Sequence, residues 1–137
     1  MKLNAVFTLI IFIVLFSCRK EKSCELNNSN FAGVFKVRSV VYKNSAADPG
    51  TDDFLTWPAC RQDNLWHFNQ NNTTLQEDVG ALCFPGGNST GNWALSGSTV
   101  VLDGQSGTII SFDCKNTVIM FPQTTPNSSI TLSLIRQ

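Results

Sequence analysis

The sequence predicts an all-β domain in which eight strands form an antiparallel up-and-down (meander) barrel. Eight short runs of strand-forming residues follow one another, separated by clusters of turn residues. No long apolar period of 3.6 residues is present, so no helix is needed. The connections are mostly short, which favours antiparallel neighbours. Eight strands can also close a sheet and remove its exposed edges, so we favour a barrel over a two-sheet Greek-key sandwich.

The first strand is expected over residues 33–42. Lys36 and Arg38 mark the face that meets water, because successive side chains of a strand point to opposite faces. The residues expected on the other face are Phe35, Val37, Ser39 and Val41. A turn-rich loop over residues 44–56 follows this strand.

The middle of the sequence predicts a hairpin with a disulfide at its open end. An Asn-rich turn joins the strands 65–68 and 73–79, and Asn tolerates the left-handed conformations that tight turns require. Cys60 lies before the first strand and Cys83 after the second. Because a hairpin brings its outer ends together, we expect a Cys60–Cys83 bridge.

The remaining strands are expected over residues 91–96, 99–103, 108–113, 117–121 and 129–136, joined by short turns. Alternation of apolar and polar residues then predicts which side chains fill the interior. The predicted interior residues are Phe35, Val37, Trp66, Phe68, Trp93, Leu95, Val100, Leu102, Ile110, Phe112, Val118, Met120, Ile130, Leu132 and Leu134.

The chain has five cysteines, of which four remain if Cys18 is acylated. An even number in an exported chain indicates disulfides. Beside the hairpin bridge, Cys24 and Cys114 either pair or stay free. No Cys-x-x-Cys spacing is present and His67 is the only histidine, so neither a metal site nor a catalytic Cys–His pair is expected.

The N-terminal residues have the layout of an export signal. A positive charge precedes an apolar run that is shorter than the roughly 20 residues needed to span a bilayer. The run ends in Leu15-Phe16-Ser17-Cys18, which resembles the lipobox of bacterial lipoproteins, where a diacylglycerol is attached to the cysteine. An ordinary secretory signal cleaved near Ser17 is the alternative.

These features divide the chain into three parts. Residues 1–17 are expected to be a lipoprotein signal peptide, residues 18–30 a lipidated cysteine with a flexible polar tether, and residues 31–137 the barrel. Two or three acyl chains such as palmitate hold a protein on a membrane permanently. We therefore expect a lipid-anchored protein of the cell envelope, with the outer membrane favoured and its periplasmic or surface face left open.

Composition argues against several functions. The net charge is zero and no Lys- or Arg-rich run is present, so nucleic acid is not an expected partner. Glu77 and Asp78 are adjacent carboxylates, but neighbours in a strand point to opposite faces. A single histidine does not supply a Ser–His–Asp set, and no nucleotide fingerprint is present. Neither catalysis nor a cofactor is expected.

Three motifs share the pattern of a known family. Residues 33–36 fit an opening G-x-W-K-type strand, residues 60–68 fit a C-x-x-D-[DN]-x-x-x-F hairpin, and residues 93–102 fit a W-x-L-x-G-x-x-L-x-L unit. Together they resemble the lipocalin-like domains of exported lipoproteins common in Bacteroidetes. The resemblance places Arg136 where lipocalins often stack an arginine over the first-strand aromatic residue, although the sequence favours a solvated terminal arginine.

Two functions follow as expectations. The resemblance implies non-catalytic binding of a small hydrophobic molecule in the barrel mouth. The residues expected to line that pocket are Trp66, Phe68, Trp93 and Met120. The alternative is an interaction or inhibitor module with a filled interior, which presents loops 48–53 and 84–87 to an envelope protein. The expected partners are a membrane, through the lipid anchor, and either a small hydrophobic ligand or such a protein.

Overall fold

The computed structural model describes residues 24–137. The expected signal peptide, Cys18 and the first part of the expected tether lie outside the described residues. None of the helices among residues 24–137 could span a bilayer.

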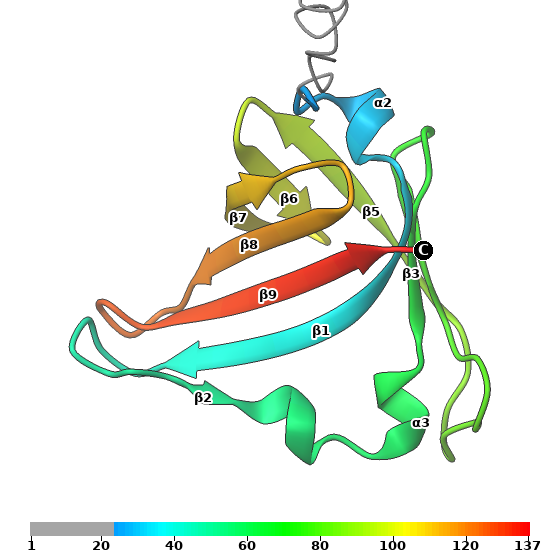
Figure 1. Ribbon diagram of the computed structural model, residues 1–137, viewed down its shortest axis with the longest axis horizontal. Helices are drawn as coiled ribbons and strands as arrows, with labels where there is room; N and C mark the ends of the chain where they lie inside the picture. Colours follow the sequence, from blue (N-terminus) through cyan, green and yellow to red (C-terminus); the bar gives the residue numbers. More distant parts are fainter. Residues whose placement is uncertain (1–23) are drawn as a thin grey trace, which may run out of the picture.

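Residues 24–137 contain a closed antiparallel up-and-down barrel of eight strands, as the sequence predicts (Figure 1). Each barrel strand pairs with the next one along the chain, and pairing of β1 with β9 closes the barrel. The barrel strands are β1 (Gly33–Lys43), β3 (Leu65–Phe68), β4 (Thr73–Glu77), β5 (Ser89–Ser96), β6 (Thr99–Leu102), β7 (Gln105–Phe112), β8 (Asn116–Pro122) and β9 (Ser129–Arg136).

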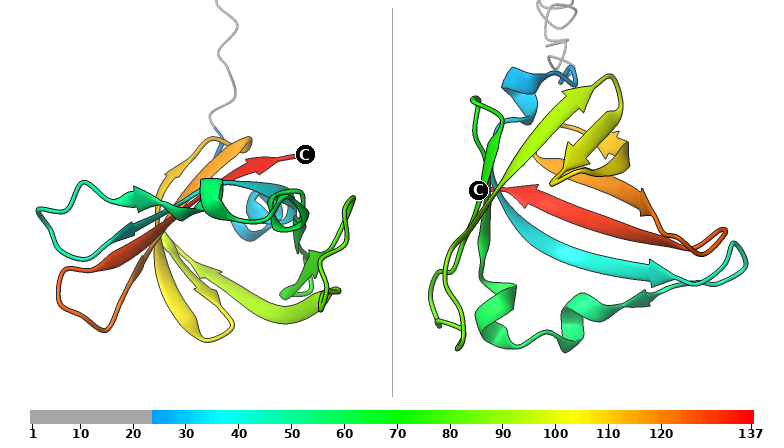
Figure 2. Two further views of the ribbon diagram at one scale, coloured as in Figure 1. Left: turned by 90° about the horizontal axis from the view of Figure 1, so that it is seen from below. Right: turned by 180° about the vertical axis from the view of Figure 1, so that it is seen from behind.

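A short additional strand, β2 (Thr51–Asp52), extends the edge of β1. β1 pairs with β3 near its start and with β2 near its end. Between these pairings, the carboxylate of Asp52 accepts hydrogen bonds from the backbone N–H of Val40 (3.0 Å) and of Phe54 (3.1 Å). The chain then returns to β3 through a 3₁₀ helix, η1 (Asp53–Thr56), and the helix α3 (Ala59–Gln62), as Figure 2 shows.

A β-bulge in β1 changes which of its side chains face the interior. The register against β9 shifts between Val37 and Ser39. A bulge inserts one extra residue and reverses the alternation beyond it. Val40 is therefore buried, and the prediction that Ser39 and Val41 share a face with Val37 is wrong.

The predicted alternation is also wrong in β7 and β8. A second register shift lies between Ile109 and Ser111, so Ile109 is buried and Ile110 is 58% exposed. In β8 the predicted interior residues Val118 and Met120 lie on the opposite face from the buried ones, which are Thr117, Ile119 and Phe121. Residues 118–121 are all apolar, so alternation alone cannot fix the phase of this strand.

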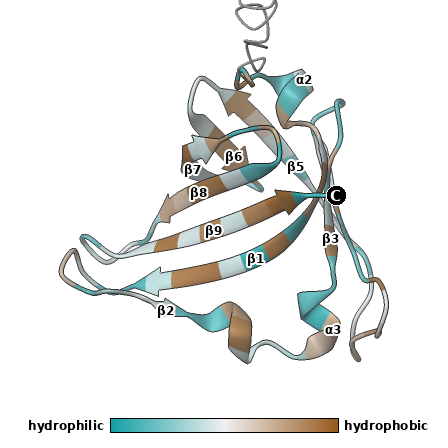
Figure 3. Ribbon diagram, in the orientation of Figure 1, coloured by the Kyte–Doolittle hydropathy of each residue, from teal (hydrophilic) through white to brown (hydrophobic). Residues whose placement is uncertain are grey.

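The other interior predictions are confirmed, and Figure 3 shows hydrophobic bands alternating along β1 and β9. The buried residues among them are Phe35, Val37, Phe68, Trp93, Val100, Leu132 and Leu134. The partly buried residues packed against this core are Trp66, Leu95, Leu102, Phe112 and Ile130.

A short helix, α2 (Asn28–Phe31), closes one end of the barrel. The Phe31 side chain is fully buried. Its ring centroid lies 5.1–6.1 Å from those of Phe35, Phe68, Trp93 and Phe112. Aromatic pairs at these separations stabilise a fold beyond their area of burial. Phe31 therefore fills the barrel at this end, and we call it the plug residue.

The expected tether is part of the folded domain from Cys24 onward. The side chain of Asn27 caps α2 by accepting a hydrogen bond from the backbone N–H of Asn30 (2.8 Å). Two disulfides lie within residues 24–137: Cys60–Cys83, as predicted, with 5.2 Å between the Cα atoms, and Cys24–Cys114, with 5.6 Å. The second bridge, which the sequence left open, joins the segment before α2 to the β7–β8 turn.

Candidate functional site

A cleft of about 370 Å³ lies between α3 and the loop of residues 78–88. These two segments stand at the end of the barrel opposite α2 (Figure 1). One wall comes from the segment that leads through α3, the other from the loop of residues 78–88, and the floor from β3, β4 and β5. The lining residues are Trp57, Arg61, Asn64, Trp66, Gln76, Asp78, Cys83, Pro85, Gly86, Gly87 and Ser89.

The floor is a row of three side chains on neighbouring strands. Trp66 lies directly opposite Gln76, and Gln76 lies opposite Ser89. Paired residues of adjacent strands project from the same face of the sheet. The Trp66 ring stacks on Phe68, with centroids 6.4 Å apart and planes at 29°. Because Phe68 is buried next to the plug residue, the indole of Trp66 connects the aromatic core to the cleft.

Asn64 is only 7% exposed and fixes the polar part of the floor. In the amide orientation that satisfies its neighbours, its nitrogen donates to Asp78 Oδ1 (3.2 Å) and to the Cys60 carbonyl (2.9 Å). Its oxygen accepts a hydrogen bond from Gln76 Nε2 (3.0 Å). These contacts hold the Gln76 side chain in place, and no protein group of residues 24–137 donates a hydrogen bond to Gln76 Oε1.

The carboxylate of Asp78 organises the wall of residues 78–88. Its Oδ2 accepts hydrogen bonds from the backbone N–H groups of Cys83 (3.3 Å) and Gly87 (3.2 Å). On the other side of the same loop, Asp63 Oδ2 accepts from the Ala81 N–H (3.1 Å). The Cys60–Cys83 bridge adds a covalent tie to α3. The wall is therefore held in position before any ligand arrives.

Arg61 supplies the positive charge of the cleft. It lies at the end of α3, its side chain is exposed, and within residues 24–137 no carboxylate oxygen lies within 4 Å of its guanidinium. On the same wall, Trp57 packs against Phe54, whose ring centroid is 5.6 Å away. The cleft thus combines two indoles, one cation, side-chain amides and a carboxylate.

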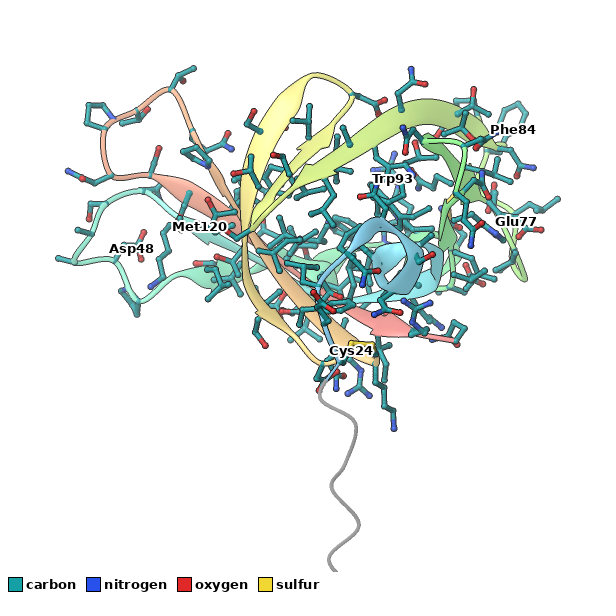
Figure 4. All side chains as sticks on the ribbon, turned by 90° about the horizontal axis from the view of Figure 1, so that it is seen from above. Cys24, Asp48, Glu77, Phe84, Trp93 and Met120 are labelled. Carbon is teal, nitrogen blue, oxygen red and sulfur yellow. A yellow bond between two sulfur atoms is a disulfide. The ribbon has the colours of Figure 1, made fainter. Side chains whose placement is uncertain are left out.

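Of the four residues predicted to line an apolar pocket, only Trp66 reaches this cleft. Phe68 and Trp93 are each 2% exposed and belong to the core, where Trp93 Nε1 donates to the Asn69 carbonyl (2.8 Å). Met120 lies on the outer face of β8, away from Trp93, as Figure 4 shows. The predicted wall is therefore not a single surface, because the phase of β8 differs from the predicted one.

The two loops predicted as contact elements differ in character. Asp48 accepts hydrogen bonds from the backbone N–H groups of Asn44 (2.9 Å) and Gly50 (2.8 Å), which lower its pKa. The Asp48 carboxylate therefore stabilises the turn that contains it. In the other loop Phe84 is 99% exposed and Leu82 is 75% exposed. Figure 4 shows Phe84 at the rim of the barrel.

His67 and Glu77 share a hydrogen bond on the outer face of the hairpin, with 2.8 Å between Nε2 and Oε2. Within residues 24–137, no lysine or arginine nitrogen lies within 4 Å of a carboxylate oxygen. Phe68 next to His67 points inward, so His67 points away from the cleft. In the same part of the chain, no group of three His, Cys, Asp or Glu side chains is arranged to hold a metal ion.

Several cleft residues were missed from the sequence, namely Trp57, Arg61, Asn64 and Gln76. Asn64 is the [DN] position of the motif over residues 60–68, so the motif could have identified it as a site residue. The others come together only when the hairpin register and the disulfide are known.

No protein-family model matches this chain, and no curated protein matches it.

Proposed function

We propose that this protein is a lipid-anchored, non-catalytic binding protein of the cell envelope, with a lipocalin-like barrel that takes a small molecule in the cleft over Trp66. The observation that carries the proposal is the row Trp66, Gln76 and Ser89, which lies between two walls held in place. A cleft of about 370 Å³ is within the size range of small-molecule sites, which runs from about 300 to 1,000 Å³.

The packing of the interior supports binding in the cleft instead of deeper in the barrel. An eight-stranded barrel holds either side chains or one small ligand. Here the plug residue Phe31 contacts four other aromatic rings. A ligand that entered this region would have to displace a buried phenylalanine.

The position of Cys24 supports an outward-facing cleft. Cys24 lies shortly before α2 and is bonded to Cys114, and α2 stands at the end of the barrel opposite α3 (Figure 1). The proposed acylation site, Cys18, precedes it by six residues (24 − 18), and a chain of that length reaches about 20 Å at most. An anchor at Cys18 therefore keeps the α2 end near the membrane and directs the cleft away from it.

Native mass spectrometry of the full-length protein, released from its own host's membranes in mild detergent, tests the cleft. We expect a reproducible added mass that Trp66→Ala loses and the outer-face control Ile110→Ala keeps. An added mass retained by Trp66→Ala would contradict the proposal, as would a bare protein that takes up no member of a metabolite panel.

A second candidate function, protein interaction, is supported by the exposed Phe84 and Leu82. Aromatic side chains such as that of Phe84 are enriched at protein interfaces, where they anchor the contact by filling a pocket of the partner. A crosslinked envelope partner that is lost with Phe84→Ser but kept with Trp66→Ala would favour this function over ligand binding.

A further inference from the structure

We infer that the ligand of the cleft is a saccharide, a ring with one apolar face and a rim of hydroxyl groups. This inference rests on the proposed function, because it assigns a ligand class to the same cleft. It differs from the expectation of a purely hydrophobic ligand.

The indoles provide a surface for the apolar face of such a ring. Trp66 and Trp57 are both partly buried, and each is packed against another aromatic ring, Phe68 and Phe54 respectively. Their orientation is therefore fixed before binding, which lowers the entropic cost of association. The indole is also amphipathic, with an apolar body suited to a ring that carries polar substituents.

The polar groups of the cleft argue against a purely apolar ligand. Arg61, Gln76 and Ser89 all line the cleft, and no hydrogen bond from the guanidinium of Arg61 or the hydroxyl of Ser89 is found within residues 24–137. Covering such groups with an apolar molecule removes their water without replacing its hydrogen bonds, which disfavours the binding of a purely apolar ligand. A hydroxyl-bearing ligand restores those hydrogen bonds.

A smaller hollow of about 50 Å³ extends the polar floor beyond the cleft. It is lined by Trp66, Thr74, Gln76, Ser89, Thr90 and Asp103, so it shares Trp66, Gln76 and Ser89 with the main cleft. Hydroxyl, amide and carboxylate side chains recur along it. This continuity gives a hydroxyl group or another small ring substituent a polar place to lie.

The charges in the cleft distinguish a saccharide from a phosphorylated ligand. Arg61 and Asp78 carry one positive and one negative charge, and the cleft lining contains no other charged side chain. A polyphosphate site needs an excess of cations or a cradle of free backbone N–H groups. Here the Gly87 N–H is already bonded to Asp78. A ring that is neutral, or that carries a single carboxylate, fits this balance.

The test uses the full-length protein and defined saccharide probes: N-acetylglucosamine, glucuronic acid, maltotriose and chitotriose. Isothermal titration and saturation-transfer NMR measure binding. We expect at least one probe to bind with a Kd below about 1 mM. Gln76→Leu should weaken it roughly tenfold, because a hydrogen-bonding group is lost from the floor. Trp66→Ala should abolish it, and Ile110→Ala should leave it unchanged.

The outcomes separate the ligand class from the proposed function. Saturable binding of palmitate or a neutral naphthalene dye, lost with Trp66→Ala and strengthened by Gln76→Leu, would overturn the saccharide and keep the cleft as a binding site. Saccharide binding indifferent to both variants would also overturn this inference. No saturable binding of any saccharide probe would overturn the saccharide inference, and an added mass that native mass spectrometry still finds on the wild type but not on Trp66→Ala would keep the proposed function. Thermal melts check that each variant folds, and Ser89→Ala replaces Gln76→Leu if that variant does not.

Discussion

The guanidinium of Arg136 lies over the ring of Phe35, with 4.7 Å between its central carbon and the ring centroid. It also donates hydrogen bonds to the carbonyl oxygens of Cys114 (2.6 Å), Ala32 (2.9 Å) and Asn30. The expectation of a solvated terminal arginine is therefore wrong, and the position implied by the lipocalin resemblance is the one observed. One side chain joins the end of β9 to α2 and to the β7–β8 turn.

Arg136→Ala should lower the free energy of unfolding by about 3 kcal/mol, since several charge-assisted hydrogen bonds and a cation–π contact are lost together. Arg136→Lys should retain less than half of the stability that Arg136→Ala loses, because an ammonium group lacks the planar fork that reaches several carbonyl groups. Urea unfolding measures both, with exposed Arg38→Ala as the control. Equal effects at positions 38 and 136 would contradict the assigned role.

Phe31→Ala should lower the free energy of unfolding by about 3–5 kcal/mol, because it leaves a cavity among four aromatic rings. Phe84→Ala removes the same atoms from an exposed site and should change stability by less than about 0.5 kcal/mol. Thermal or urea unfolding of the pair gives the comparison. If the two variants melt alike, Phe31 does not fill the barrel in solution.

Each disulfide should stabilise the domain. Cys60–Cys83 closes a loop with a sequence separation of 23 and Cys24–Cys114 one of 90. From the loss of chain entropy, the expected stabilisation is about 3 kcal/mol for the shorter loop and about 4–5 kcal/mol for the longer one. Unfolding of Cys60→Ser, Cys24→Ser and the reduced wild type measures these effects. A melt indifferent to Cys60→Ser and to reductant would show that the hairpin bridge is absent.

The β7–β8 turn should be sensitive to acid. Hydrogen bonds from Asn116, and from the backbone of Lys115, lower the pKa of Asp113 below its ordinary value of 3.8. Because the folded-state pKa lies below the unfolded one, this stabilisation is present above about pH 4 and is lost as the pH falls through the lowered pKa. The melting temperature of Asp113→Asn should lie below that of the wild type at neutral pH and converge with it in acid. A gap independent of pH would contradict this assignment.

Cys18→Ala tests the proposed anchor. Palmitate labelling of the host should acylate the wild type and leave the variant unlabelled, and the soluble domain should fold equally well in both. The control is Cys60→Ser, which should keep its label. Equal labelling of wild type and Cys18→Ala would end the lipobox interpretation.

Most of the fold followed from local patterns. The eight barrel strands and the Cys60–Cys83 bridge depend on alternation and on turn chemistry within short stretches. The bulges in β1 and β7 were not predictable, because Val40 and Val41, like Ile109 and Ile110, are pairs of similar residues that fit either phase. Met120 was placed inside for the same reason.

The cleft was harder to predict, because its walls come from separate parts of the chain. Trp66 was named as a ligand contact from its aromatic character, and it is the one predicted wall residue that lines the cleft. Arg61 and Gln76 are unremarkable in sequence and acquire a role only through the register of β3 against β4 and the position of α3. The plug residue was taken as the first residue of the barrel domain, since nothing local predicts that it lies among Phe68, Trp93 and Phe112.

The Cys24–Cys114 bridge has a mechanical consequence under the proposal that the chain is anchored at Cys18. Tension transmitted along the chain from the membrane meets the bridge before it meets α2. The bridge passes the force to the β7–β8 turn, so residues 25–31, including Phe31, do not carry it. In the oxidised protein, pulling on the N-terminal side therefore does not withdraw the plug. After reduction the same force acts directly on α2 and on the carbonyl groups that Arg136 holds.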